Sequence, residues 1–161
     1  MTPTDRRSDA NPIRDLWART AHLPGGRRLF SLLLGRMVPY TGTISPRVEE
    51  LRTGYARVSM RDGRRVRNHL GSIHAIAIMN LAEVTGGLAL NYGLPSDARA
   101  ILTALSIEYT RKARGRLTGE AHVDLPATSE RREYDFVTVV TDSSGEEVAR
   151  ATARWLVGPK Q

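Results

Sequence analysis

The order of apolar and polar positions divides the chain into three regions. Between residues 11 and 37, apolar side chains recur at helical spacing in two short segments, and Pro24-Gly25-Gly26 separates them. The pattern becomes extended over 44–52 and 54–61, on either side of Thr53-Gly54. These patterns predict two N-terminal helices followed by a pair of antiparallel strands.

A long helix is predicted over residues 72–90, and it is apolar on nearly every side. The run Asn91-Tyr92-Gly93-Leu94-Pro95, with its glycine and proline, ends it. Because a helix that is apolar all round must be buried all round, we expect other elements to wrap it.

Four extended segments supply that wrapper, at 98–113, 116–125, 131–141 and 147–157, with turn sequences between them. Strands joined by short turns form an antiparallel meander. Together with the first pair they predict an α+β fold: a long central helix wrapped by a curved six-stranded antiparallel sheet. We expect a helical extension over residues 1–42 and the sheet-and-helix domain over 43–158.

Composition narrows the classes of protein. The 161-residue chain has no cysteine, which excludes disulfides, thiolate metal sites and a cysteine nucleophile. No apolar run reaches the roughly 18 residues that span a bilayer, and the first 17 residues do not resemble a secretory signal. We therefore expect a cytoplasmic protein without an integral membrane segment.

The net charge of +7 is almost entirely arginine, since Lys112 and Lys160 are the only lysines. Guanidinium groups match the geometry of phosphates, so an anionic ligand is one explanation and compositional bias is the other. The arginines show no stripe interleaved with aromatic residues and no helix-turn-helix pattern, so we expect no nucleic-acid partner.

Several signatures of other enzymes are missing from the sequence. It has no Walker loop, no dinucleotide fingerprint and no Gly-x-Ser-x-Gly elbow. The four histidines lack the spacing of metal ligands. We therefore expect neither a metal nor a cofactor.

The segment from Asn68 to Gly87 resembles the motif region of hotdog-fold thioesterases of the phenylacetyl-CoA-thioesterase type, above all a sparsely characterised bacterial branch. In that family an asparagine lies six positions before the histidine at the start of the central helix, and an acid lies nine after it. Asn68, His74 and Glu83 keep both spacings. The resemblance covers roughly residues 44–157 and implies the hotdog fold.

The resemblance also implies an acyl-CoA thioesterase without a cofactor. It assigns the oxyanion hole to the backbone N–H of Ala75 after His74, the positioning of the carbonyl or of a water molecule to Asn68, and the general base or nucleophile to Glu83. The usual His-Gly-Gly is His74-Ala75-Ile76 here. Alanine keeps the backbone N–H, but it cannot adopt the conformations reserved for glycine.

Helix geometry constrains such a site. Nine residues at about 100° each place His74 and Glu83 on opposite sides of the helix, about 13 Å apart along its axis. One chain therefore cannot bring Glu83 to its own Ala75. If the roles hold, the site is composite, and we expect a homodimer or a dimer of dimers that binds acyl-CoA between subunits.

Other residues of the region have two interpretations each. Glu83 is catalytic or an acid paired with an arginine, and Asn80 bonds Glu83 or the substrate. The N-terminal helices pack on the sheet, or they form a lid or a membrane contact. The alternative function is a non-catalytic acyl-binding protein of the same fold, because both glycines after His74 are replaced. Gly86 and Gly87 either leave room for an acyl chain or allow the helix to pack closely on the sheet. Arg111, Lys112 and Arg114 either bind the phosphates of CoA or form a solvated strand end.

Overall fold

A computed structural model describes residues 11–125 and 128–160. Its helices are α1 (Pro12–Thr20), α2 (Gly26–Met37), α3 (Pro39–Gly42) and α4 (Ala75–Gly93), with a 3-10 turn, η1, at Arg64–Val66. Its strands are β1 (Arg47–Arg52), β2 (Tyr55–Met60), β3 (Ala98–Tyr109), β4 (Leu117–His122), β5 (Arg132–Thr141) and β6 (Glu147–Pro159).

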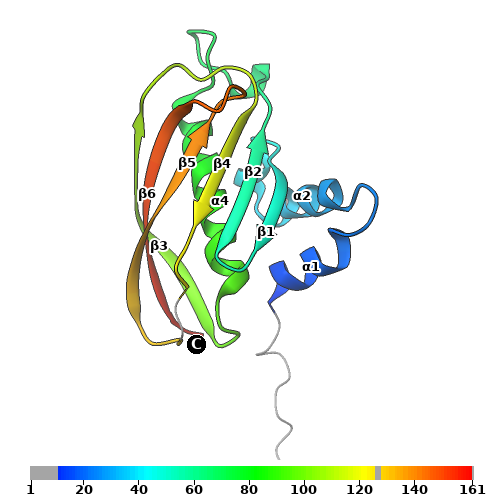
Figure 1. Cartoon of the computed structure of the whole chain (residues 1–161), viewed down its shortest axis with the longest axis vertical. Coiled ribbons are helices and arrows are strands. Elements are labelled where there is room, and N and C mark those ends of the chain that lie inside the picture. The colour runs from blue at the N-terminus through cyan, green and yellow to red at the C-terminus, as the bar shows by residue number, and fades with distance from the viewer. Residues whose placement is uncertain (1–10, 126–127, 161) are drawn as a thin grey trace, which may run out of the picture.

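The six strands form one curved sheet with α4 against one face (Figure 1). The strand order is β1-β2-β4-β5-β6-β3, and every neighbouring pair is antiparallel. This confirms the predicted six-stranded antiparallel sheet around a central helix. The two edges are β1, beside the N-terminal helices, and the 12-residue strand β3.

The middle of α4 is enclosed as predicted. Leu81 and Leu90 are fully buried, and each such side chain stabilises the fold by about 1.5 to 3 kcal/mol. The first turn differs, because Ala75 and Ile76 lie outside the cover of the strands and Ile76 is 48% exposed. The prediction of burial on all sides is therefore wrong for the turn where the helix begins.

Two elements differ from their predicted boundaries, one because of a helix cap and the other because of the path of the chain. The central helix begins at Ala75 rather than residue 72, because His74 has extended backbone angles and its ring caps the helix. Strand β3 ends at Tyr109 rather than residue 113, because the chain then crosses to the start of α4, where the Ile73 N–H donates to the Ala113 carbonyl at 2.9 Å.

The N-terminal helices pack on the domain through buried side chains. Trp17 of α1 meets Phe30 of α2 edge-on, with ring centroids 5.0 Å apart, and both are part of the core. The Ser31 hydroxyl of α2 accepts a hydrogen bond from the Val48 N–H of β1 at 2.9 Å. For Trp17 and Phe30 the packing interpretation is therefore correct. No helix in the described ranges is long and apolar enough to cross a membrane.

Gly119 allows α4 to lie close to β4. A Cβ at this position would lie 2.7 Å from Thr85 Oγ1, and the Thr85 hydroxyl is held by the Leu81 carbonyl. We expect Gly119→Ala to lower the free energy of unfolding by about 1 to 3 kcal/mol, because the helix must shift. Gly63→Ala is the matched control, since its Cβ meets no atom within 4 Å. Urea denaturation measures both, and equal stabilities would contradict this packing.

Candidate active site

The turn that precedes α4 is organised by Asn68. Its Oδ1 accepts hydrogen bonds from the backbone N–H groups of Leu70 at 2.9 Å and Ser72 at 3.2 Å, and its own N–H donates to the Ser72 carbonyl at 2.8 Å. The side-chain oxygen is therefore used within the turn. The Nδ2 group has no acceptor among the described residues, so it is free to donate to a ligand.

His74 is the N-cap of α4. Its Nδ1 accepts from the Ile76 N–H at 3.1 Å, which places the proton of a neutral ring on Nε2, and the exposed ring faces solvent. The N–H of Ala75, the first helical residue, has no acceptor in residues 11–125 and 128–160. A free N–H at a helix start, with the positive end of the helix dipole behind it, favours a negatively charged oxygen.

Tyr109, at the end of β3, fixes this first turn in place. Its hydroxyl donates to the Ala75 carbonyl at 2.8 Å. Burial raises the pKa of the Tyr109 phenol, so the hydroxyl remains a donor at neutral pH. Sequence reasoning missed this residue, because no periodicity or motif links a strand end to a helix start 34 positions away.

Glu83 is half-buried on α4 and faces a notch left by Gly87. A Cβ at Gly87 would lie 3.3 Å from Trp155 Cη2 and 3.6 Å from Glu83 Oε1, so the carboxyl group and the indole ring border the same space. No described residue bonds or pairs with the carboxyl group, so the alternative interpretation, an acid paired with an arginine, finds no such partner among them. Desolvation accordingly raises the pKa of Glu83.

Asn80 lies one turn before Glu83 on α4, but its side chain bonds elsewhere. Its Nδ2 donates to the Tyr40 carbonyl at 3.1 Å instead of to Glu83. It also lines a small pocket of about 180 Å³ at the helix start, together with His74, Ile76 and Ala77. The structure therefore places Asn80 beside His74, with its amide anchored to the segment that precedes the sheet.

The paired glycines of α4 lie against the sheet. A Cβ at Gly86 would come within 2.6 Å of Phe136 Cε2, and Gly87 lies under Trp155. Close packing therefore accounts for Gly86. At Gly87 the missing side chain also leaves the space that the Glu83 carboxyl group borders.

The basic segment after β3 runs beside the start of α4. The bond from Ile73 to Ala113 holds it there, and the Gly115 N–H donates to Asp62 Oδ2 at 3.0 Å. The side chains of Arg111, Lys112 and Arg114 are exposed, and Arg111 pairs with Glu146 at 3.4 Å. This start of α4 thus gathers Asn68, His74, Ala75, Asn80 and the basic segment, whereas Glu83 lies farther along the helix.

The described part of the chain has no group of three or more histidine, aspartate or glutamate side chains that could hold a metal. The region contains a free backbone N–H at Ala75, the carboxamide of Asn68 and the Glu83 carboxyl group, whose pKa is raised. Such groups suit acyl transfer, in which a carbonyl oxygen becomes negative and a water molecule must lose a proton.

Comparison with known proteins places the chain among structures of the same fold. The family model for a domain of unknown function, DUF4442, matches residues 26–157, starting with α2. A structural-genomics target is 29% identical, with 93% of this chain and 98% of that chain covered and a TM-score of 0.78. No curated protein matches the chain.

Two further solved structures carry functional descriptions. A probable thioesterase of Pseudomonas aeruginosa is 26% identical over 86% of this chain and 97% of that chain, with a TM-score of 0.73. A thioesterase enzyme of Staphylococcus aureus is 15% identical over 75% and 99%, with a TM-score of 0.67. These neighbours have the hotdog fold, and so does this chain.

The raised pKa of Glu83 makes stability depend on pH. Because the folded-state pKa exceeds the unfolded value, the folded chain holds more protons between the two pKa values, and stability falls as pH rises through that window. We expect Glu83→Gln to be more stable than wild type at about pH 8 and to lose this advantage near pH 4. Thermal unfolding across pH measures the difference. If Glu83→Gln were more stable than wild type by the same amount at both pH values, the raised pKa of Glu83 would be contradicted.

Proposed function

We propose that this chain, which belongs to the DUF4442 family and has the hotdog fold, hydrolyses acyl-CoA thioesters at a site shared between two subunits. One observation carries the proposal. The same helix presents a free N–H at Ala75, suited to an oxyanion, and an unpaired, half-buried carboxyl group at Glu83. The thioesterases among the structural neighbours support the same reaction class.

The start of α4 would hold the thioester carbonyl. The Ala75 N–H donates to the carbonyl oxygen, and its bond strengthens as the oxygen becomes negative during attack. Asn68 Nδ2 is a second donor, and Asn68 Oδ1 keeps the turn in shape. Alanine at position 75 serves this role because the donor is a backbone group. The tether from Tyr109 keeps that group fixed.

Glu83 would activate the attacking water. The carboxylate takes a proton from the water as its oxygen bonds to the thioester carbon, and the tetrahedral intermediate then expels the CoA sulfur. The proton on Glu83 passes to the leaving thiolate, so the carboxylate is regenerated. A carboxyl group of raised pKa is a stronger base than an exposed one, and it can also return the proton at neutral pH.

The two groups meet only between chains. Glu83 lies eight residues beyond Ala75, which is about 12 Å along the helix axis, so one subunit cannot bring its own carboxyl group to its own Ala75 N–H. Strand β3 offers the interface, since it is a 12-residue sheet edge without proline or lysine, and its charged residues are Arg99 and Glu108. Such an edge is prone to pair with another strand. Antiparallel pairing of two β3 strands would bring the α4 start that Tyr109 tethers in each subunit next to the other subunit.

The replacement of Gly-Gly by Ala75-Ile76 favours a second candidate, a non-catalytic protein that binds acyl-CoA or fatty acyl groups. Ile76 is exposed at the helix start and lines the small pocket there, so it narrows the approach to the Ala75 N–H. Such a protein would be stabilised by acyl-CoA without releasing free thiol.

Replacement of the base tests the reaction. We expect Glu83→Gln to lower the rate of acyl-CoA hydrolysis by about 10²- to 10⁴-fold, because the amide cannot accept the proton of water. The control is Glu50→Gln on the outer edge strand β1, whose exposed carboxylate pairs with Arg52. Release of free CoA thiol from a panel of acyl-CoAs measures both. Full activity in the Glu83 variant would remove Glu83 from the mechanism.

Mixed dimers test the shared site. Asn68→Asp keeps the oxygen that shapes the turn but removes the Nδ2 donor, so it and Glu83→Gln should each be inactive alone. After subunit exchange, about one quarter of wild-type activity should return, since half of the dimers are hybrids with one intact site of two. Thiol release before and after exchange measures this. Failure to recover, with exchange confirmed by mass spectrometry, would contradict a shared site.

A further inference from the structure

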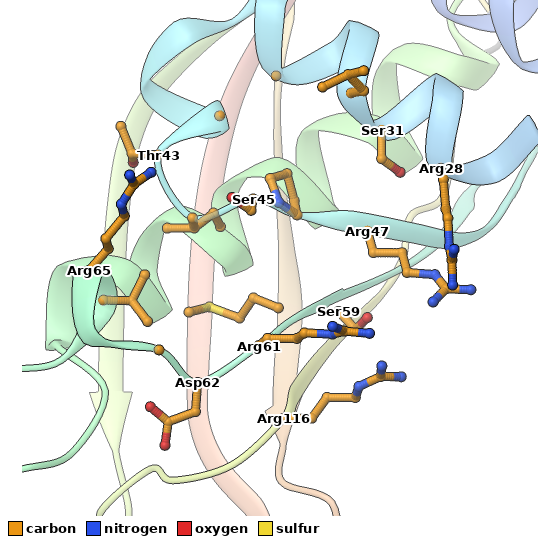
Figure 2. Close-up of a pocket in the computed structure, with 18 of the residues that line it drawn as sticks. Arg28, Ser31, Thr43, Ser45, Arg47, Ser59, Arg61, Asp62, Arg65 and Arg116 are labelled. Atoms are coloured by element: carbon orange, nitrogen blue, oxygen red, sulfur yellow. The ribbon is translucent and has the colours of Figure 1, made fainter. Parts of the chain in front are cut away.

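A groove of about 1070 Å³ lies on the side of the molecule where α2 and α3 meet β1 and the loop after β2 (Figure 2). Arginines from four parts of the chain line it. Arg28 and Arg36 come from α2, and Arg47 from β1. Arg116 precedes β4, and three more lie in residues 61–65. Sequence patterns do not reveal this cluster, because its members are spread over almost ninety positions.

Most of these arginines have no partner in the fold. Arg47 and Arg116 lie 3.5 and 3.8 Å from Glu49, and the guanidinium groups of the other five make no ion pair or hydrogen bond with any described residue. Elsewhere on the surface many arginines are paired, as in the bond of Arg154 to Asp135 at 2.8 Å and of Arg150 to Glu147 at 2.6 Å. The groove therefore gathers five guanidinium groups that have no acidic partner among the described residues.

The acids near the groove are already engaged. Asp62 is the acidic residue among those that line it, and it accepts from Arg67 at 2.7 Å and from the Gly115 N–H at 3.0 Å. The hydrogen bond from Arg67 holds the pKa of Asp62 below its usual range. Glu49 accepts from the Ser59 hydroxyl at 2.7 Å. Arg47 Nε is buried without a hydrogen-bond acceptor among the described residues, despite its proximity to Glu49.

Such a cluster is unfavourable in the absence of an anion. Like charges closer than the Debye length of about 8 to 10 Å repel one another, and the repulsion is screened less inside a groove than on an open surface. A phosphate removes that repulsion, and planar guanidinium groups bind it through paired hydrogen bonds. Figure 2 shows Arg28, Arg47, Arg61 and Arg116 directed toward one end of the groove, and Arg65 beside Thr43 at the other.

The groove adjoins the start of α4. Thr43, Ile44, Arg65 and Val66 line both the groove and the small pocket that contains His74 and Asn80. The groove also has an apolar part, formed by residues such as Leu32, Ile44 and Met60. A ligand with an anionic head at the four-arginine end could therefore extend past Arg65 to the Ala75 N–H.

We propose that this groove binds the phosphorylated nucleotide end of CoA, with the phosphates on Arg28, Arg47, Arg61 and Arg116 and the pantetheine arm passing Thr43 toward α4. The proposal rests on the proposed function for its direction along the groove. It places phosphate recognition in the groove instead of on the exposed segment with Arg111, Lys112 and Arg114. A phosphomonoester carries about 1.5 to 2 negative charges at neutral pH, so the nucleotide end with its diphosphate matches several free guanidinium groups.

The test measures binding rather than hydrolysis, with CoA, dephospho-CoA and pantetheine as probes in calorimetry. We expect wild-type affinity to fall in that order as phosphates are lost. Arg61→Gln/Arg116→Gln should weaken CoA binding by at least about tenfold and shrink the difference between CoA and dephospho-CoA. Two control variants each remove the same two positive charges. Arg111→Gln/Lys112→Gln changes the basic segment after β3, and Arg131→Gln/Arg132→Gln changes the start of β5, outside the groove. Both should bind CoA as wild type does.

The outcomes separate this inference from the proposed function. Equal CoA binding by wild type and the groove variant, at matched melting temperature, overturns the inference, as does a loss caused by Arg111→Gln/Lys112→Gln alone. Groove-dependent binding to phosphatidic acid vesicles without CoA binding also overturns it and indicates a lipid head group. CoA binding that depends on the groove, in a protein that releases no thiol from acyl-CoA, supports the inference and removes the proposed hydrolysis.

Discussion

The enclosure of α4 is the constraint on which the rest of the structure depends. From Ala77 onward the helix has almost no polar side chain to present to water, so it is stable only inside a cover of other elements. The sheet curves around it, and Gly119 allows a strand to approach its backbone. The N-terminal helices close the side at β1, where Phe30 joins the same core. The residues of α4 that are exposed are Ala75 and Ile76 in its first turn, which is the turn that holds the free N–H.

Two features of this fold are unfavourable for an empty protein. Glu83 places an ionisable group in the apolar helix without a partner among the described residues, and desolvation acts against its charged form. The groove gathers arginines whose charges have few acids to offset them. Sites that break local rules of stability in this way are where proteins bind or react. The proposed substrate, an acyl thioester whose carrier is multiply phosphorylated, would explain both features.

The sequence predicted the fold well because the signal is strong over long stretches. A helix without a polar face and six extended segments admit few arrangements. The predicted meander of the last four strands is correct for β4, β5 and β6 but wrong for β3, which pairs with β6 at the sheet edge while β4 pairs with β2. The turn around Asn68 and the capping role of His74 were within reach of local pattern as well. Contacts between residues far apart in the sequence could not be predicted from local pattern. The tether from Tyr109 to Ala75 and the convergence of Arg28 with Arg116 depend on tertiary packing, and arginines spread along a sequence give no warning that they will meet.

The composite site is the central claim, and a crystal structure with a 2-oxoalkyl-CoA thioether tests it most directly. This analogue keeps the carbonyl group but has no thioester bond to cleave. The account predicts that the carbonyl oxygen accepts from the Ala75 N–H of one subunit at about 3 Å, with Glu83 of the other subunit facing the carbonyl carbon. A carbonyl bound away from the start of α4, or a site completed by the Glu83 of the same chain, would contradict it.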